Sequence, residues 1–402
     1  MKVAFVCPFF GPEASGGAEF ASRSLAMHLA GSGITIDVLT TCLLDLPHGI
    51  TRNHHAPGVS SDGPLTVRRF PVESPDMRHF EVLNDLIIRR VPISWAEELQ
   101  FMTRHVTSPD LIRFMAAQAH DYAFFCFIPY LFGTTCFGAE AVPRAKRILI
   151  PCFHDEGYAD LQLVRRLASA VDRFVFNSPA EERFAHRHFN IDPGSGITAG
   201  LGVDTAITGD AARFRSRFGL EDPFVLYAGR RDTTKNVHTL IDYFLRFKQK
   251  RPGPLKLVLI GPAPLPTTAS SPDLVDLGFV TEQEKRDAYA AAAVFCQPSL
   301  NESFSYVLME AWLCGTPCLV HEDCDVTRDH VVESGGGLYF RTAADFAGAL
   351  DRLLGDAPLG RRMAAAGRRY VLDHYAWPEI IRRFKEQVFI SPPASPAADQ
   401  RP

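Results

Sequence analysis

A basic loop between residues 229 and 236 is the first feature of this sequence that could do chemistry. It places Arg230, Arg231 and Lys235 between an apolar run and the next helical segment. An arginine offers a planar fork of N–H donors to phosphate oxygens, and a lysine offers a mobile point charge. A solvated basic turn would have the same composition, so the loop alone does not decide between the two.

A glycine pair, Gly16-Gly17, lies between the N-terminal apolar run and another helical segment. Backbone N–H groups at a helix N-terminus can bind phosphate, and glycine lets the ligand approach them closely. The surrounding spacing does not match G-x-G-x-x-G, which argues against a nicotinamide dinucleotide. A phosphate contact and a tight turn are equally compatible with the pair.

Two glutamates, Glu302 and Glu310, follow a third apolar run. Glu310 lies within an apolar helical segment, where a carboxylate requires a polar partner. At ~1.5 Å of rise per residue, the two carboxylates would lie roughly 10–12 Å apart. A glycosidase pair is separated by only about 5–9.5 Å. The spacing instead suits two contacts along one extended ligand.

Strands and helices that alternate along the chain must position these loops. Short, fully apolar runs are typical of parallel strands buried on both faces. We expect strands at 3–8, 34–41, 124–128, 148–151, 173–177, 224–228, 255–260, 275–279, 294–297 and 317–320. We expect helices at 18–30, 236–250, 282–292, 305–314 and 377–389, and a loop over 43–65. This alternation predicts an α/β fold with two doubly wound, Rossmann-like domains.

The expected domain limits follow the two runs of alternation. The first domain would cover 1–200 and the second 201–375, sizes that suit the 402-residue length. A C-terminal helix over 376–390 would return to the first domain. The Pro/Ala-rich tail over 391–402 is expected to be disordered.

Charge and cysteine content exclude several classes of protein. The net charge is −4 and neither half is basic, so we expect no nucleic-acid partner. The nine cysteines are odd in number and scattered through apolar runs, which favours a reducing compartment over a disulfide or zinc framework. We find neither a signal peptide nor an apolar stretch of membrane-spanning length, and we expect a cytoplasmic protein.

One segment, from Leu83 to Arg104, mixes Trp95 and aliphatic residues with arginines. This composition suits a helix at a membrane interface. Pro92 interrupts the segment and nearby acids offset its charge, so a helix pair covering the ligand cleft of the first domain is an equal alternative. We expect at most weak, salt-sensitive contact with the inner face of an anionic membrane.

In their order and spacing, the motifs resemble the retaining, nucleotide-sugar-dependent glycosyltransferases of the GT-B fold, family four. The matching motifs are Gly16-Gly17-Ala18-Glu19, His154-Asp155, 200–204 (GLGVD), Gly229-Arg230 with Lys235, 278–280 (GFV), Pro298-Ser299, Glu302 with Glu310, Gly315-Thr316-Pro317 and Tyr375-Ala376-Trp377. The resemblance covers nearly the whole chain and is strongest from 223 to 340. It implies two lobes that face each other across a cleft, with the acceptor in the first and the nucleotide sugar in the second.

The resemblance also implies roles for single residues. Arg230 and Lys235 would neutralise the donor diphosphate, and Gly16-Gly17 would close over it. Glu310 would accept hydrogen bonds from the ribose, and Glu302 would hold hydroxyls of the transferred sugar. The remaining positions are the backbone N–H groups of Phe304, Ser305 and Tyr306 beside the sugar, Val280 beside the base, and His154 at the sugar or at the forming bond.

The implied reaction moves a hexose-type sugar from a UDP or GDP donor to an acceptor hydroxyl with retained anomeric configuration. The acceptor would be a glycan, a glycolipid or a lipid-linked oligosaccharide. The leaving phosphate would act as the base in a front-face substitution, with no cofactor and no metal. Asp323-Cys324-Asp325 could in principle hold a cation, but the basic residues already meet the diphosphate.

Two departures from the family pattern bear on the donor sugar. Ser303 and Ser305 stand where glycines usually flank the phenylalanine, and 321–324 (HEDC) replaces a Gly-Gly turn. A nucleotide-sugar epimerase or hydrolase on the same fold is the alternative activity. A two-lobe solute-binding protein is the non-enzymatic alternative, disfavoured by the absent signal peptide and by the charged loops.

Overall fold

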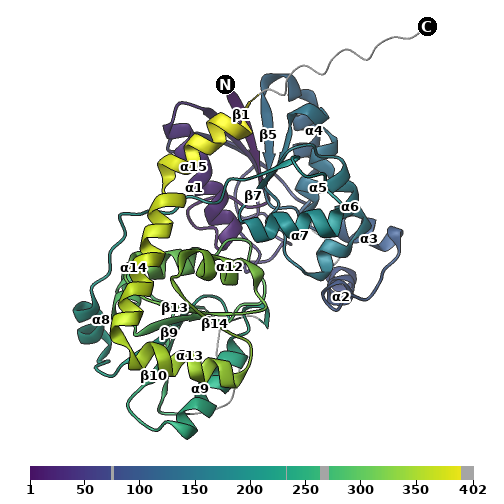
Figure 1. Ribbon diagram of the computed structural model, residues 1–402. Coiled ribbons are helices and arrows are strands. Elements are labelled where there is room, and N and C mark those ends of the chain that lie inside the picture. The colour runs from purple at the N-terminus through teal and green to yellow at the C-terminus, as the bar shows by residue number, and fades with distance from the viewer. Residues whose placement is uncertain (74–76, 232, 263–270, 391–402) are drawn as a thin grey trace. The chain divides into compact units, whose positions relative to one another are not determined.

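The computed structural model describes residues 1–73, 77–231, 233–262 and 271–390, which group into two compact units (Figure 1). The first unit comprises Met1–Asn177, Ala185–Gly200 and the segment from Pro378 onward. The second comprises Ser178–Phe184 and Leu201–Trp377. The expected disordered tail, residues 391–402, lies outside the described residues.

An eight-stranded sheet of order β3-β4-β2-β1-β5-β6-β7-β8 forms the centre of the first unit. Its strands are β1 (Lys2–Val6), β2 (Thr35–Thr41), β3 (Gly58–Asp62), β4 (Leu65–Phe70), β5 (Phe124–Phe127), β6 (Arg147–Leu149), β7 (Phe174–Phe176) and β8 (Gly196–Thr198). Its helices are α1 (Gly17–Gly31), α2 (Met77–Ile88), α3 (Trp95–Arg104), α4 (Pro109–Ala117), α5 (Gly133–Glu140), α6 (Gln162–Ser169) and α7 (Pro179–Phe189), whose first residues group with the second unit. Neighbouring strands run parallel except β3, which pairs antiparallel with β4.

A six-stranded, wholly parallel sheet of order β11-β10-β9-β12-β13-β14 forms the centre of the second unit. Its strands are β9 (Phe224–Ala228), β10 (Lys256–Ile260), β11 (Leu274–Gly278), β12 (Val294–Gln297), β13 (Cys318–His321) and β14 (Gly337–Phe340). Its helices are α8 (Ala211–Phe218), α9 (Val237–Lys250), α10 (Glu282–Ala291), α11 (Tyr306–Leu313), α12 (Asp325–Ser334), α13 (Ala343–Gly355) and α14 (Ala357–His374). Two Rossmann-like sheets confirm the predicted fold class.

Apolar runs located the buried strands well and the exposed ones poorly. Strand β9 is fully buried along its length, as its sequence FVLYA predicts. The prediction of a loop over 43–65 is wrong at its end, because β3 lies there as an edge strand. Strand β3 is almost wholly exposed and needs only backbone hydrogen bonds from β4, so no apolar pattern marks it. Strand β14, at the edge of the second sheet, also escaped prediction.

The core of the second unit shows how the sheet is covered. Helices α9 and α13 lie side by side (Figure 1). Their apolar faces share one cluster with the strands. Phe244 of α9 and Leu350 of α13 are fully buried in it, with Val225 and Leu257 from the sheet. Helices α11 and α14 form another packed pair, with Trp312 fully buried. The loops at the strand ends therefore rest on a rigid support.

The chain after α14 packs on the first unit, as the fold prediction requires. Helix α15 (Trp377–Arg383) continues into one π-helical turn, Phe384–Val388. Arg383 Nη1 donates to the carbonyl of Ala199 at 2.7 Å, and Phe389 stacks on Phe124 with ring centroids 5.8 Å apart.

Two further features of the fold are the state of its cysteines and the character of its helices. All nine cysteines are free, and all but Cys314 are buried. None of the helices in the described part of the chain combines the length and the apolar character needed to cross a membrane.

The strand order places the functional loops. In the second sheet the chain order reverses between β9 and β12, and in the first between β1 and β5. Ligands of open α/β sheets bind beyond the carboxyl ends of strands at such reversals. The basic loop follows β9 and the Glu302 loop follows β12, so the fold brings the two loops to one edge of the second sheet.

Candidate functional site

An ion pair joins the two loops at that edge. Lys235 ends the short 3-10 turn Thr233–Lys235 after β9, and its Nζ lies 2.7 Å from Glu302 Oε1. Gln297, the last residue of β12, donates from Nε2 to the same oxygen at 2.8 Å. The side chains of Lys235 and Glu302 are 19% and 13% exposed, so water screens their attraction less than it screens a surface pair.

A second ion pair surrounds Glu310. Lys285 Nζ of α10 lies 3.2 Å from Glu310 Oε2, and Tyr289 donates its hydroxyl to the same oxygen at 3.2 Å. Burial raises the pKa of Glu310, and Lys285 opposes that rise. The polar partner that an acid in an apolar helix requires is therefore present. Lys285 and Tyr289 were missed in the sequence, because only the packing of α10 on α11 brings them to Glu310.

The basic side chains of the loop differ in their burial and in their partners. Arg231 is buried, with Nη1 2.9 Å from Asp276 Oδ2 and Nη2 3.3 Å from the carbonyl oxygen of Leu259. It therefore fastens the loop to β10 and β11. Arg230 is exposed, and Lys235 is half-buried. Arg230 and Lys235 are the predicted phosphate ligands, and both remain at the sheet edge.

The segment after Glu302 buries the ring of Phe304. Phe304 is 2% exposed, and its ring packs against Tyr375 and His330 with centroids 5.0 and 5.8 Å apart. Ser305 has a left-handed backbone (φ 83°) and precedes Tyr306, the first residue of α11. The expectation that this segment acts through N–H groups is compatible with the buried Phe304 ring.

The predicted base contact lies after β11. Val280 is 9% exposed, whereas its neighbour Phe279 is 82% exposed. Gly278 ends β11 with a left-handed φ of 61°. The loop therefore holds Val280 against the protein and turns Phe279 to solvent.

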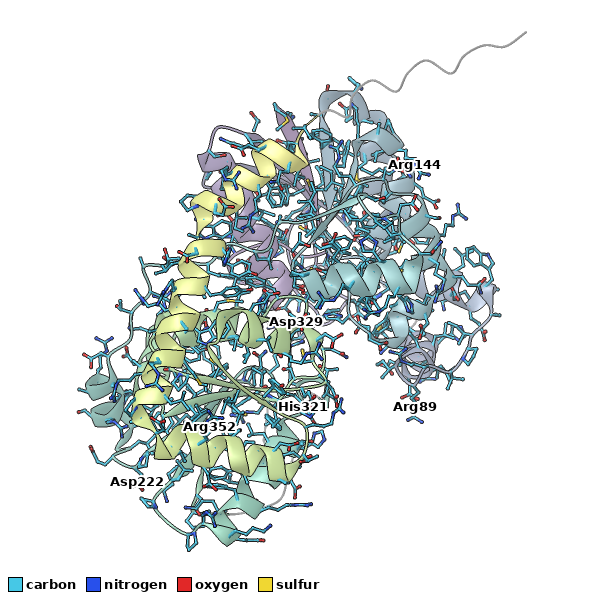
Figure 2. All side chains as sticks on the ribbon, in the orientation of Figure 1. Arg89, Arg144, Asp222, His321, Asp329 and Arg352 are labelled. Atoms are coloured by element: carbon cyan, nitrogen blue, oxygen red, sulfur yellow. The ribbon has the colours of Figure 1, made fainter. Side chains whose placement is uncertain are left out.

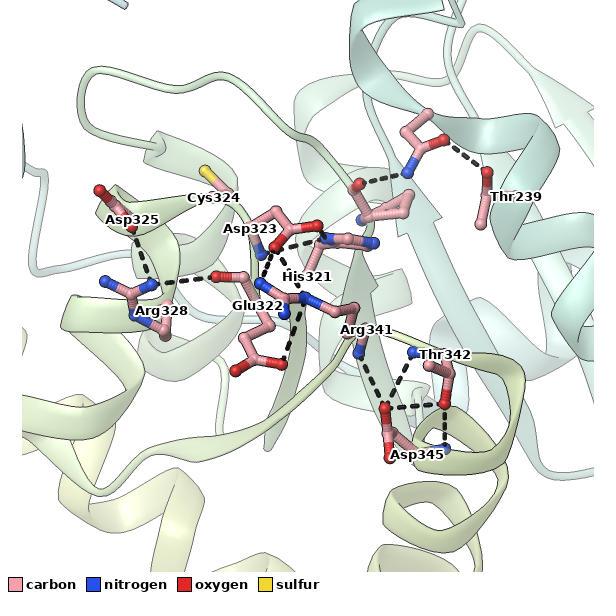
Figure 3. A network of polar contacts seen from close by, with 12 residues as sticks. Thr239, His321, Glu322, Asp323, Cys324, Asp325, Arg328, Arg341, Thr342 and Asp345 are labelled. Atoms are coloured by element: carbon pink, nitrogen blue, oxygen red, sulfur yellow. Dashed lines mark hydrogen bonds and ion pairs between the residues drawn. The ribbon is translucent and has the colours of Figure 1, made fainter. Parts of the chain in front are cut away.

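Arginines hold the Asp-x-Asp sequence (Figure 3). Arg341 Nε donates to Asp323 Oδ1 at 2.9 Å, and Arg328 Nη1 lies 2.8 Å from Asp325 Oδ1. The backbone N–H of Asp323 donates to His321 Nδ1 at 3.2 Å. Across the ranges given above, no group of three or more His, Cys, Asp or Glu side chains could hold a metal ion. The two aspartates are therefore part of an ion-pair network with arginines.

In the first unit, the glycine pair begins α1. Gly16 has φ 135°, and a Cβ there would lie 2.0 Å from Glu19 Oε2. The backbone conformation therefore favours glycine, whereas the Glu19 carboxylate is the far end of a flexible side chain and could move aside. The preceding Ser15 donates from its backbone N and its Oγ to Asp45 at 3.1 and 2.6 Å, which ties the loop after β1 to the loop after β2.

His154 lies in the loop after β6. Its Nδ1 is 3.1 Å from Glu156 Oε1, which also accepts a hydrogen bond from Tyr130 at 2.7 Å. Burial would raise the pKa of Glu156, but His154 and Tyr130 bring it below its ordinary value. An ionised Glu156 therefore orients the imidazole. Glu156 was not singled out in the sequence, although its position two residues after His154 could have indicated a contact between the two side chains.

Comparisons with known proteins identify the family and the fold that the chain resembles. Residues 209–370 match the family Glycosyl transferases group 1. A D-inositol 3-phosphate glycosyltransferase of Stackebrandtia nassauensis is 33% identical over 234 residues, which cover 52% of each chain. A second protein of that name, from Acidothermus cellulolyticus, is 31% identical over 47% of each. The chain thus aligns with about half the length of the curated relatives it matches.

Solved structures match over nearly the whole chain. Sucrose-phosphate synthase from Thermosynechococcus elongatus has a TM-score of 0.70 at 19% identity and covers 96% of this chain and 98% of its own. HepE of Anabaena, solved with UDP and glucose, has a TM-score of 0.67 at 16% identity and covers 96% and 99%. At these identities the matches establish the fold. The chain therefore has the GT-B fold, and its residues 209–370 match the family model of the glycosyl transferases group 1.

Proposed function

We propose that this protein is a retaining glycosyltransferase that transfers a hexose from a nucleoside diphosphate sugar to an acceptor hydroxyl. The observation that carries the proposal is the contact of Lys235 with Glu302 at the strand reversal of the second sheet. A phosphate-binding cation and a hydroxyl-binding carboxylate adjoin there, as the phosphate and the sugar adjoin in such a donor.

The diphosphate would bind where β9 ends. Arg230 offers an exposed guanidinium, and Lys235 would turn from Glu302 toward a phosphate oxygen. As the bond between the sugar and the phosphate breaks, negative charge grows on the leaving oxygen, and fixed cations stabilise it. The backbone N–H groups of 304–306 would lie beside the sugar.

The ribose would bind at Glu310. Its carboxylate is held by Lys285 and Tyr289, so it needs little reorganisation to accept hydrogen bonds from two hydroxyls. Val280 would lie beside the base. HepE, which was solved with UDP and with UDP-glucose, makes UDP-glucose the first donor to test.

The first unit would bind the acceptor, with Gly16-Gly17 over the diphosphate and His154 at the reacting bond. The acceptor oxygen forms a bond to the sugar on the face that the phosphate leaves. Because attack and departure share one face, the anomeric configuration is kept, and the proton of the acceptor hydroxyl passes to the departing phosphate oxygen. Glu156 would fix the ring orientation of His154. The acceptor would be a glycan, a glycolipid or a lipid-linked oligosaccharide, and weak membrane contact would occur through α2 and α3.

The proposal is tested by thermal stabilisation with a panel of UDP and GDP sugars. A ligand that binds only the native state raises the melting temperature. NMR of the products formed from the stabilising donor, with and without added glycans and inositol phosphate, then separates the activities. A new glycoside that needs an acceptor supports transfer, whereas an isomerised or hydrolysed sugar from the donor alone supports the epimerase or hydrolase alternative. Stabilisation by no member of the panel would overturn the proposal.

A further inference from the structure

A side-chain relay reaches Glu302 from the end of β12. Ser305 Oγ donates to Gln297 Oε1 at 2.7 Å, and Gln297 Nε2 donates to Glu302 Oε1 at 2.8 Å. Gln297 is 3% exposed and Ser305 is 7% exposed. Because the serine hydroxyl holds the amide oxygen, the amide N–H group is turned toward the carboxylate.

Both members of the relay are unfavourable choices for their positions. Ser305 has φ 83° and ψ 81°, a left-handed conformation that favours glycine. Gln297 ends a buried parallel strand whose other residues, Val-Phe-Cys, are apolar. The strained serine and the buried amide bind each other, and the amide binds the Glu302 carboxylate. Two unfavourable residues that together position one carboxylate indicate a functional constraint.

Lys235 explains why such a relay is needed. It binds the same oxygen of Glu302 that Gln297 binds. Under the proposed function, the donor diphosphate draws Lys235 away, and the carboxylate then loses its strongest partner. Gln297 carries no charge and has no such competing attraction to phosphate, so its hydrogen bond persists when the donor binds.

We propose that Gln297 and Ser305 are positioning residues that hold the Glu302 carboxylate toward the transferred sugar while Lys235 engages the diphosphate. They thereby make the site select its donor by the sugar as well as by the nucleotide. The inference rests on the proposed function and deepens it.

Two variants test the relay with little change in volume or fold. Gln297→Met keeps the length of the side chain and removes the amide donor. Ser305→Gly removes the hydroxyl and suits the left-handed backbone, so its melting temperature should not fall by more than a few degrees. Ser303→Gly is the matched control, because it adds a glycine to the same loop and leaves the relay intact.

Calorimetry with UDP, GDP, UDP-glucose and GDP-mannose gives the readout, since the ratio of nucleotide-sugar to nucleotide affinity isolates the contribution of the sugar. The ratio should fall about tenfold in Gln297→Met, which loses a hydrogen bond to the charged Glu302. It should fall by no more than that in Ser305→Gly, which loses the neutral hydrogen bond that orients the amide. Affinity for the bare nucleotide should stay within about twofold of wild type, since the relay adjoins only the sugar. The double variant should be no weaker than Gln297→Met, because the serine acts through the amide.

The outcomes separate this inference from the function on which it rests. An unchanged ratio in either single variant, or an equal loss in Ser303→Gly, would overturn the relay while leaving the transferase proposal in place. Failure of the wild-type protein to bind any of the four compounds would overturn the proposed function, and the inference with it.

Discussion

The two units share one kind of sheet, yet the loops at their strand reversals are built differently. In the second unit, two short loops of neighbouring strands supply the joined pair Lys235 and Glu302. In the first unit, the polar contacts spread over more strand ends: Ser15 binds Asp45 across the loops after β1 and β2. His154 and Glu156 lie after β6.

This difference indicates which part of a binding site can be recognised from short sequence motifs. Charged groups on two adjacent loops can bind a constant feature such as a diphosphate. Contacts dispersed over several long loops suit a ligand that varies between relatives. Changes in the second unit should therefore act on nucleotide or donor binding, and changes in the first on the transfer rate.

The largest effect should come from Lys235→Ala. Loss of a charge-assisted contact to the diphosphate costs about 1.5–3 kcal/mol, or roughly 10–150-fold in donor turnover. Lys235 is half-buried against Glu302, so the change also removes the positively charged partner of that carboxylate. Lys235→Ala/Glu302→Gln removes both charges and should regain stability but not turnover.

Lys250→Ala is the control for that measurement, since Lys250 is an exposed lysine at the far end of α9. Steady-state kinetics and thermal melts on the three variants separate the binding effect from the folding effect. Lys235→Ala activity within twofold of wild type would contradict the phosphate assignment.

The two glutamates should fail in different ways. Glu310→Gln should weaken bare nucleotide binding by about tenfold, because the ribose contact exists with or without the sugar. Glu302→Gln should leave bare nucleotide binding nearly unchanged and depress sugar transfer. Calorimetry with UDP and GDP decides the matter, and equal losses in both variants would mean that the ligand is oriented differently.

In the first unit, Glu156→Gln should slow transfer by about fivefold and leave nucleotide affinity unchanged. The variant keeps the shape of the side chain but removes the charge that orients the His154 ring, so it loses about one hydrogen-bond equivalent. Single-turnover rates with saturating donor measure the effect. An accompanying loss of nucleotide affinity would contradict the expectation that the first unit acts on the transfer rate and the second on nucleotide binding.

A pH titration of nucleotide binding should show a smaller effect. The pKa of Glu310 is raised by burial, so its carboxylate takes up a proton at a higher pH than an ordinary glutamate does. Affinity should be full at neutral pH and should fall as the pH drops through that raised value. The Glu310→Gln variant should lack this step, and an identical profile in both proteins would assign the proton to another group.

The smallest effect is expected at a membrane surface. Helices α2 and α3 and their connection expose Val82, Ile88, Val91, Trp95 and Leu99. Arg89, however, lies 3.0 Å from Asp85, and Arg90 lies 3.0 Å from Asp160 (Arg89 is labelled in Figure 2).

A free basic residue adds only about 1 kcal/mol of attraction to an anionic surface, and a paired one adds less. Sedimentation with anionic vesicles should therefore show weak binding at low salt and none at high salt. Tight binding that persists in high salt would mean that the apolar side chains insert.

The sequence by itself determined the alternation of buried strands and helices, and with it the fold. A continuous run such as that of β9 permits little besides a parallel strand covered on both faces. Parallel topology then places the loops after such strands at one edge of a sheet, so both loops were candidate sites from the sequence alone. The roles expected of Lys235 and Glu302 came from the resemblance to the glycosyltransferase family.

Only the tertiary structure decided which partners these residues have. Arg230 and Arg231 are neighbours of one type in the sequence, yet Arg231 is buried against Asp276 while Arg230 faces solvent. Lys285 likewise reaches Glu310 only through the packing of α10 on α11. Such pairings join segments remote in the chain, and their energies depend on distance and burial. Residue type and spacing in the sequence specify neither the distance nor the burial, because the packing of the folded chain sets both.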